Sequence, residues 1–261
     1  MNTSLQGKTA VIGGSTQGIG LAIAQELAGL GATCILLARN ETTLKEIAAT
    51  LPAPHGQQHS YQVADFSQPT QVKQAIDNIV AKQPVHLLIN NTGGPTPGPI
   101  SDATPDAFLA AFNQHIICNQ LLVQAVIPGM KEAAYGRIIN IVSTSVRIPI
   151  ANLGVSNTIR GATASWAKTL ANELGQFGIT VNNILPGLTK TQRLTSLIQN
   201  NAKRSNRSPE EIEKEMLNEI PARRFGEAAE LAALAAFLAG PAAAYINGTS
   251  IPVDGGKTGS I

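Results

Sequence analysis

The sequence has little charge, only two cysteines and no long apolar run. Charged residues make up 14% of the 261 residues and hydrophobic residues 43%, which argues against disorder and predicts a compact globule with a substantial core. The net charge of +2 is too small to indicate nucleic acid or an anionic membrane as the main partner. No apolar run reaches the roughly 20 residues that span a bilayer, and no signal peptide is visible. We therefore expect a cytoplasmic protein without nucleic-acid or membrane partners.

The scarcity of cysteine and histidine limits metal and disulfide chemistry. We expect Cys34 and Cys118 to be buried free thiols in a reducing compartment. His55 and His59 are four residues apart, which is the spacing of a metal pair on a helix. They lie, however, in a loop rich in Pro and Gly with no third ligand evident, so we expect no metal site.

Short apolar runs alternate with segments of helical periodicity along the whole chain. Strands that are apolar on both faces and separated by helices indicate an α/β fold, with a parallel sheet covered on two sides in three α/β/α layers. No linker interrupts the pattern, so residues 1–261 are expected to form a single domain. Residues 188–221 are polar, Asn-rich and expected to be irregular. The pattern predicts strands at 9–12, 34–38, 61–64, 85–89, 137–142, 179–185 and 249–253, and helices at 19–30, 42–51, 68–81, 105–130 (as one helix or two), 153–177 and 227–239.

A glycine-rich loop separates the first expected strand from the first helix. Gly14, Gly18 and Gly20 follow the pattern Gly-x-x-x-Gly-x-Gly, where the missing Cβ atoms allow a tight turn and a close approach of backbone N–H groups to a pyrophosphate. The partial positive charge at the helix N-terminus favours the same anion. This placement predicts a dinucleotide site whose candidate contacts are Gly14, Ser15, Thr16, Gln17, Gly18, Ile19 and Gly20.

Arg39 bears on the choice of cofactor. It ends the second expected strand, nineteen residues after Gly20, where an acidic residue would bind a ribose 2′-hydroxyl. An Arg at this place favours a 2′-phosphate, although it can also be a solvated residue at a strand end. We therefore expect NADP(H) in preference to NAD(H).

From end to end the sequence resembles the short-chain dehydrogenase/reductase family. The resemblance implies a Rossmann-like doubly wound parallel sheet, a mobile lid over the substrate at residues 188–221, and a homo-oligomer, a tetramer or a dimer. The family usually has Thr where Gly13 stands, and general likeness within the family points to 3-oxoacyl-[acyl-carrier-protein] reductases. The motifs that carry the resemblance are Gly13-Gly14-Ser15-Thr16-Gln17-Gly18-Ile19-Gly20, Asn90-Asn91-Thr92-Gly93, Gly136-Arg137-Ile138-Ile139-Asn140, Pro186-Gly187 and Val253-Asp254-Gly255-Gly256.

Three further segments resemble the cofactor contacts of that family. One lies beside the adenine ring, one ends the fourth strand near the ribose, and one meets the nicotinamide carboxamide. In the second segment the resemblance implies that Asn91 helps to fix the central sheet. The candidate contacts from these segments are Asp65, Phe66, Asn91, Gly93, Pro186, Gly187 and Thr189.

The catalytic positions depart from the family pattern of a Ser followed about thirteen residues later by Tyr-x-x-x-Lys. Ser143 matches the Ser, but Ser156 stands at the Tyr position and Arg160 at the Lys position. Counting back from Met130, His115 stands where the family has a helix Asn. A Ser hydroxyl is a far poorer acid than a phenol, and losing general acid catalysis costs roughly 10²- to 10⁴-fold. His115, with an unperturbed pKa of about 6.5, is a candidate proton donor, or else a buried structural histidine.

Two main functions remain open from the sequence. The first is an NADP(H)-linked oxidoreductase acting on a small-molecule or acyl-thioester substrate through an altered site. The second is a catalytically impaired nucleotide-binding scaffold or sensor. Hydride transfer to an already polarised acceptor, which needs no strong acid, is a third possibility.

Overall fold

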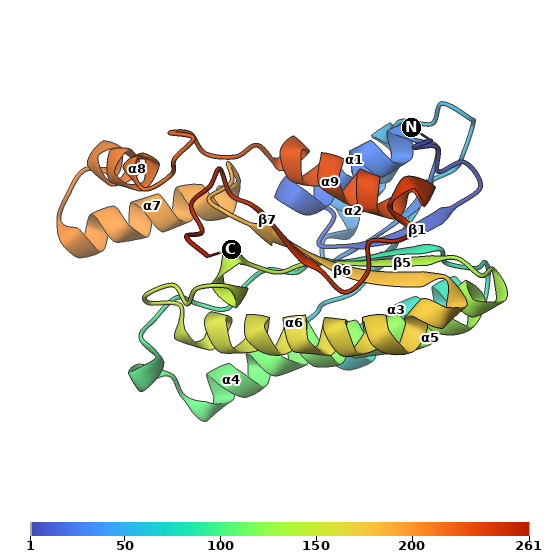
Figure 1. Cartoon of the computed structure of the whole chain (residues 1–261), viewed down its shortest axis with the longest axis horizontal. Helices are drawn as coiled ribbons and strands as arrows, with labels where there is room; N and C mark the ends of the chain where they lie inside the picture. Colours follow the sequence, from blue (N-terminus) through green and yellow to red (C-terminus); the bar gives the residue numbers. More distant parts are fainter. Residues whose placement is uncertain (1, 261) are drawn as a thin grey trace.

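The computed structural model describes residues 2–260, which form a three-layer α/β/α fold around one sheet of seven parallel strands (Figure 1). The strands lie in the order β3-β2-β1-β4-β5-β6-β7. Strands are added on one side of β1 up to β3 and on its other side from β4 onward, which is the arrangement of a doubly wound Rossmann-like sheet. Every expected strand is present with its ends shifted by at most two residues. The strands are β1 (Thr9–Gly13), β2 (Thr33–Ala38), β3 (Ser60–Val63), β4 (Leu87–Asn90), β5 (Gly136–Ile141), β6 (Ile179–Pro186) and β7 (Ser250–Val253).

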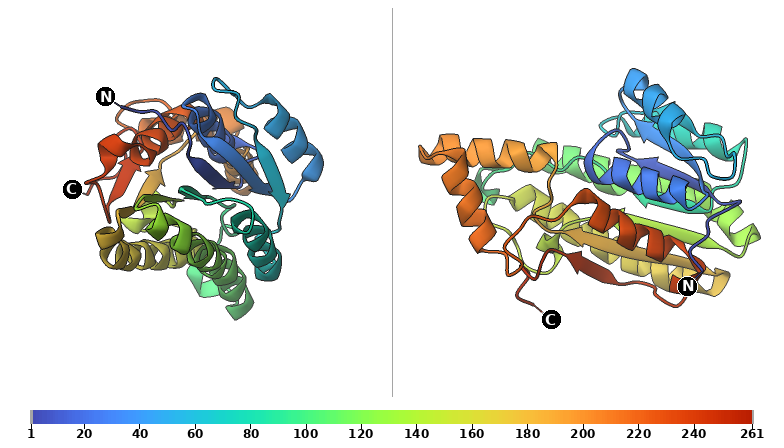
Figure 2. Two further views of the ribbon diagram at one scale, coloured as in Figure 1. Left: turned by 90° about the vertical axis from the view of Figure 1, so that its right-hand side faces the viewer. Right: turned by 90° about the horizontal axis from the view of Figure 1, so that it is seen from above.

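Helices cover both faces of the sheet (Figures 1 and 2). One face packs against α1 (Gly18–Gly29), α2 (Glu41–Thr50) and α9 (Ala228–Ala239). The other packs against α3 (Pro69–Val80), α5 (Cys118–Glu132) and α6 (Gly154–Leu174). None of the helices within residues 2–260 is long and apolar enough to cross a membrane.

Successive side chains of the central strands point alternately to the two helical layers, so both faces of the sheet are buried. In β1, Ala10 and Ile12 point to the α1 face, whereas Val11 points to the α3 face. In β2, Cys34 lies on the first of these faces, and its thiol is free and fully buried, as expected. Because successive side chains point to opposite sides of a strand, continuous apolar runs require two helical layers.

The segment that the sequence leaves open as one helix or two is two helices. α4 (Pro105–Phe112) and α5 are joined by a π-helical turn, Asn113–Ile117. The wider turn inserts an extra residue into the helical path, a feature often found at functional sites. It contains His115, which is only 1% exposed.

The expectation that residues 188–221 are irregular is wrong. They contain α7 (Gln192–Ser205) and α8 (Pro209–Asn218), which extend beyond one end of the layers (Figures 1 and 2). Leu194, Leu197 and Ile198 recur at helical spacing and join a small cluster around Phe225. The outer face of these helices is polar and Asn-rich, so the composition of the segment does not reveal the helical spacing of its few apolar residues. We call residues 192–218 the helical arm.

A chain of buried amides crosses four strands. Asn90 Nδ2 donates to Asn140 Oδ1 at 2.8 Å, and Asn140 Nδ2 donates to Asn183 Oδ1 at 2.8 Å. Asn183 Nδ2 in turn donates to Ser250 Oγ at 3.0 Å. These bonds tie β4, β5, β6 and β7 together close to the edge at which the candidate site residues gather.

Candidate active site

The glycine loop forms a cradle that side chains would fill. Gly14 and Gly18 have φ values of +56° and +54°, a left-handed conformation that favours glycine. A Cβ on Gly20 would lie 2.2 Å from the Gly14 carbonyl oxygen. The backbone can close this tightly only because these three positions lack side chains.

Polar groups in this cradle are left for a ligand. Ser15 is fully buried, and its Oγ has no hydrogen-bond partner among the described residues. α1 begins at Gly18, and the side chain of its N-cap residue, Gln17, makes no capping bond there. The first N–H groups of the helix are therefore free to bind an anion, and the cradle fits the phosphates of a dinucleotide. Thr16 and Ile19, half-buried, complete the loop.

Asn91 and Asn90 divide the tasks that the sequence assigns to Asn91 alone. Asn91 Nδ2 donates to the carbonyl oxygens of Gly13 and Gly14 at 3.1 and 3.2 Å, so it holds the glycine loop. The cross-sheet bond comes from Asn90 instead. Gly13, where the family usually has Thr, is needed here because a Cβ would lie 2.9 Å from the Asn91 carbonyl oxygen.

The ends of β2 and β3 lie beside the glycine loop. Gly14 N donates to Leu37 O at 2.9 Å, two residues before the exposed Arg39. The end of β3 is tied to β2 by a bond from Ala64 N to Ala38 O at 2.9 Å, directly before half-buried Asp65. Arg39 and Asp65 therefore lie at the edge of the sheet where the sequence predicts the adenosine half of the nucleotide.

Phe66 is packed against the glycine loop, whereas Gly93 borders open space. Phe66 is 7% exposed, and its Cζ lies 3.2 Å from an ideal Cβ on Gly13, so the ring packs beneath the glycine loop. Gly93 has open space around the position of a Cβ. Gly93 O accepts a bond from Gln114 Nε2 at 3.0 Å. This bond engages only the carbonyl, and the side of Gly93 where a Cβ would lie stays open.

The segment after β6 approaches the same edge. Pro186 ends the strand, and a Cβ on Gly187 would lie 2.6 Å from Asp254 Cα. Thr189 Oγ1 donates to Gly187 O at 3.2 Å, so this hydroxyl is already engaged. Thr191, which the sequence analysis missed, places its methyl carbon 3.2 Å from an ideal Cβ on Gly18. The motif stops short of Thr191, and only the fold brings it to the glycine loop.

His115 lies in a buried, cationic setting. Its Nδ1 is 2.8 Å from Thr92 Oγ1, whereas its Nε2 has no partner among the described residues. Burial, together with the positive charges of Arg160 and Arg193, lowers the pKa of His115 to about 3. The pKa of His115 in the folded protein therefore lies far below the unperturbed value of about 6.5, and the imidazole is neutral at neutral pH.

The other three catalytic candidates lie at the end of β5 and on α6. Ser143 is half-buried, and its Oγ accepts a bond from Ser145 N at 3.1 Å. Ser156 is 7% exposed. Arg160, 8% exposed, donates from its Nη1 to Ile141 O at 3.0 Å, and burial lowers its pKa to about 10. Arg160 thus remains charged at neutral pH.

Arg193 is a site residue that sequence reasoning missed. It lies in the first turn of α7, and its Nη1 donates to Gly94 O at 3.3 Å. One side of Arg193 is in solvent, while loss of hydration where it packs lowers its pKa. Its contact with Gly94 spans 99 residues, so no local pattern could have found it.

Comparison with known proteins decides the family. The family model described as Enoyl-(Acyl carrier protein) reductase matches residues 14–258, nearly the whole chain. The chain belongs to the short-chain dehydrogenase/reductase family. This membership accounts for the glycine loop, the strand order and the position of the candidate residues at one edge of the sheet.

Relatives within the short-chain dehydrogenase/reductase family include several reductases. The NADPH-dependent reductase BacG of Bacillus subtilis is 31% identical over 97% of this chain and 99% of its own. The 3-oxoacyl-[acyl-carrier-protein] reductase FabG of Pseudomonas aeruginosa is 34% identical over 97% of this chain and 98% of its own. The structure of L-sorbose reductase from Gluconobacter frateurii with NADPH and L-sorbose superimposes with a TM-score of 0.93 at 29% identity, covering 100% of both chains.

The tyrosines of this short-chain dehydrogenase/reductase lie away from the candidate site. All three are within the described residues. Tyr61 is on β3, where its hydroxyl donates to Glu41. The Tyr135 hydroxyl donates to Ala239 O at 2.5 Å, before β5 begins, and Tyr245 is fully exposed. Among residues 2–260 no tyrosine hydroxyl is therefore placed beside Ser143 or Arg160.

The histidine pair of the loop after α2 has other contacts. His59 Nδ1 accepts a bond from Cys34 N at 3.0 Å, and its Nε2 lies 2.9 Å from Pro52 O. His55 packs its ring against Gly31. Within the described part of the chain, no group of three or more His, Cys, Asp or Glu residues is arranged to hold a metal ion.

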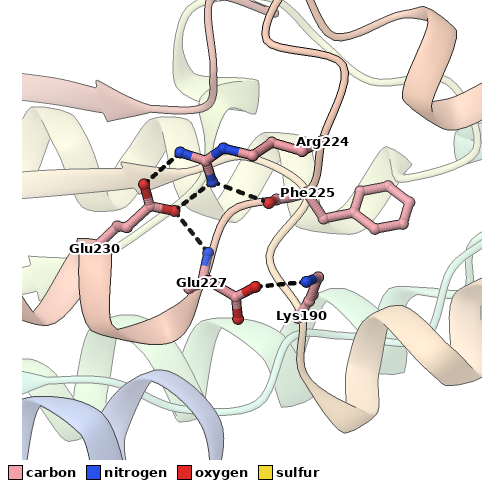
Figure 3. Close-up of polar contacts among 5 residues, drawn as sticks. All are labelled: Lys190, Arg224, Phe225, Glu227 and Glu230. Atoms are coloured by element: carbon pink, nitrogen blue, oxygen red, sulfur yellow. Dashed lines mark hydrogen bonds and ion pairs between the residues drawn. The ribbon is translucent and has the colours of Figure 1, made fainter.

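Residues 188–190 pair with residues 226–227 and form a short stem that attaches the helical arm, and Figure 3 shows the polar side-chain contacts around it. Lys190 N donates to Gly226 O at 2.9 Å, and Lys190 Nζ pairs with Glu227 at 2.5 Å. Arg224 binds Glu230 with both guanidinium nitrogens, at 2.6 and 2.8 Å. Glu230 also accepts from Glu227 N, which caps α9. The stem thus fixes both ends of the arm to the start of α9.

Proposed function

We propose that the protein is an NADP(H)-dependent oxidoreductase that reduces a carbonyl group or oxidises a hydroxyl group, such as that of a 3-oxoacyl group. The observation that carries the proposal is the glycine cradle, in which Gly20 leaves no room for a Cβ and Ser15 Oγ lacks a partner among the described residues. The BacG relative is named NADPH-dependent, and the sorbose reductase neighbour is a complex with NADPH. When bound, the dinucleotide supplies or accepts a hydride at the substrate carbon.

The chain offers groups for each part of the nucleotide. The loop N–H groups and Ser15 would bind the pyrophosphate, and Arg39 would bind the 2′-phosphate. Asp65 and Phe66 would lie toward the adenine ring, with Phe66 acting from beneath the loop. Asn91 keeps the loop in shape. Gly93 and residues 186–189 would lie toward the ribose and nicotinamide, and Thr191 adds a contact at Gly18.

Proton transfer must proceed without an imidazolium or a phenol. In the tautomer in which the Thr92 hydroxyl donates to Nδ1, His115 presents an N–H at Nε2. Because Nε2 itself is buried, that proton passes to the substrate oxygen through Ser156 or a water molecule, while the Thr92 proton moves to Nδ1 and Thr92 regains a proton from water, which leaves hydroxide in the solvent. Ser143 and Ser156 hydrogen-bond the substrate oxygen, and Arg160 favours its developing negative charge. The relay leaves His115 neutral before and after the step.

A panel assay tests this proposal. Purified protein at high concentration should oxidise NADPH with at least one acyl or cyclic ketone. Ser143→Ala and His115→Asn should each lower kcat by roughly 10²-fold or more, because each removes a group that stabilises or protonates the oxygen. Ser196→Ala, an exposed hydroxyl on α7, is the matched control and should retain full activity. Unchanged turnover of His115→Asn would remove His115 from the mechanism.

The second candidate is a nucleotide-holding scaffold or sensor that has lost catalysis. It is favoured by the low acidity of Ser156 and by the distant tyrosines. It predicts tight NADPH binding and no turnover with any carbonyl in the panel. The same assay therefore separates the two candidates.

We also propose that residues 188–221 act as a lid over the substrate. The proposal is supported by the contact of Thr191 with Gly18 and of Arg193 with Gly94, which bring the base of the arm to the candidate site. Hydrogen exchange should show slower exchange in the arm when NADPH is added. Equal exchange with and without NADPH would contradict a lid.

A further inference from the structure

Three consecutive residues after β4 each contact a different polar side chain. Thr92 Oγ1 contacts His115, Gly93 O accepts from Gln114, and Gly94 O accepts from Arg193. A Cβ on Gly94 would lie only 2.7 Å from Arg193 Nη2, so the guanidinium lies flat against this backbone. The helical arm and the π-helical turn thus meet at one short segment.

Arg160 brings a second guanidinium to the same space. It reaches Ile141 O at the end of β5, the strand next to β4. Arg193 reaches Gly94 O, which follows β4, and β4 pairs with β5. Arg160 and Arg193 therefore lie near a common region that also contains His115, whose Nε2 has no partner among the described residues, and the charges of both lower the pKa of His115 beyond the effect of burial.

No carboxylate within residues 2–260 lies at ion-pair distance from either of these arginines. Two other arginines on or beside the arm are paired, since Arg207 contacts Glu215 at 2.6 Å and Arg224 contacts Glu230 at 2.6 Å. Arg160 is buried, and a buried guanidinium without a counter-charge is unfavourable, so an anionic ligand bound nearby would relieve that cost. The positive charge at this site therefore lacks a partner that the fold could have supplied.

We propose that the substrate is a free oxo acid whose carboxylate is bound by Arg193, rather than a neutral ketone or a thioester. This inference rests on the proposed function and narrows its substrate. Arg193 is suited to the task because its planar fork matches a carboxylate and one side of it is open to solvent. Arg160 is deeper, beside the reacting oxygen.

The nucleotide phosphates are the competing occupant, and the placement argues against them. Their cradle is at Ser15 and Gly18, which Thr191 adjoins. Arg193 instead bonds to Gly94, two residues beyond the contact between Thr92 and His115. The guanidinium accordingly belongs to the half of the site where the carbonyl would react.

Calorimetry on the complex with NADP⁺ tests the proposal, because the oxidised cofactor cannot reduce the added ketone. We would titrate pyruvate, 3-oxobutanoate and 4-oxopentanoate, each against its methyl ester, so that the spacing between carboxylate and carbonyl varies. At least one acid should bind at least tenfold more tightly than its ester. Arg193→Gln should abolish that preference, Arg193→Lys should recover part of it, and Arg204→Gln, an exposed position on α7, should leave it unchanged.

The outcomes separate this inference from the proposed function. If NADP⁺ does not bind to the wild-type protein, the proposed function fails as well. If NADP⁺ binds but no acid is preferred over its ester, or if the preference survives Arg193→Gln, only the oxo-acid proposal is overturned. A loss of NADPH affinity in Arg193→Gln as large as the loss for the acid would assign the arginine to the cofactor and overturn it too.

Discussion

At the scale of single residues, Gly20 is where the smallest change should have the largest effect on the site. A methyl group there would lie 2.2 Å from the Gly14 carbonyl oxygen and 2.6 Å from Asn91 Nδ2. Gly20→Ala should therefore displace the loop and weaken NADPH binding at least tenfold, at a stability cost of about 1–3 kcal/mol. Gly29→Ala, at the far end of the same helix with open space around it, is the matched control. Its NADPH affinity should be unchanged, and calorimetry of both variants checks the pair.

His115 should make stability depend on pH in a defined direction. Its pKa falls from 6.5 to about 3 on folding, so the unfolded chain binds a proton between these values and the folded protein does not. The contribution of His115 to the free energy of unfolding is therefore fully present above the unfolded pKa. It decreases by about 1.4 kcal/mol per pH unit as the pH falls below that pKa. In urea unfolding at pH 7, 6 and 5, His115→Gln should lose less stability than the wild type. Parallel profiles for the two proteins would contradict the buried, neutral imidazole.

Residue roles were predictable from sequence where they depend on local backbone chemistry. The glycine loop is such a case, because spacing alone places its three glycines in a turn between strand and helix. The lowered pKa of His115 and the presence of Arg193 were not predictable. Both depend on charges brought together from α6, α7 and the π-helical turn, which are far apart in the chain.

At the scale of elements, the buried amide chain across the sheet should depend most on its central residue, Asn140. Asn140 is fully buried and both accepts from Asn90 and donates to Asn183. Asn140→Ala leaves two buried groups unpaired, so it should cost about 2–4 kcal/mol of unfolding free energy. Ser250→Ala removes only the last bond of the chain and should cost about 1 kcal/mol. Urea unfolding measures both losses, and equal losses would contradict the central position of Asn140 in the chain.

The elements themselves were largely predictable, with one informative exception. Apolar runs identify the central strands β1, β2, β4, β5 and β6, which are buried on both faces, whereas the edge strands β3 and β7 are partly exposed and follow from the alternation with helices. The helical arm was missed because its buried face is small, formed by residues such as Leu194, Leu197 and Ile198 against Phe225. A polar helix with a narrow apolar stripe resembles a loop in composition, and only its period distinguishes the two.

At the scale of the whole molecule, we predict a homo-oligomer, a tetramer or a dimer. α4 exposes Leu109 by 61% and Phe112 by 41%, which gives the single chain an apolar outer face on its fourth helix. Light scattering should report two or four times the chain mass of 27.2 kDa. A mass equal to one chain across a range of protein concentrations would contradict this.

The proposed activity requires a pyridine dinucleotide that lies across the carboxyl edge of the sheet with its phosphates in the glycine cradle. Isothermal titration of the wild-type protein with NADPH and, separately, NADH tests this most directly. We predict saturable binding of both, tighter for NADPH because Arg39 follows β2 at the place of the 2′-phosphate. Tighter binding of NADH would contradict the role of Arg39, and no heat of binding from either nucleotide would contradict the central claim.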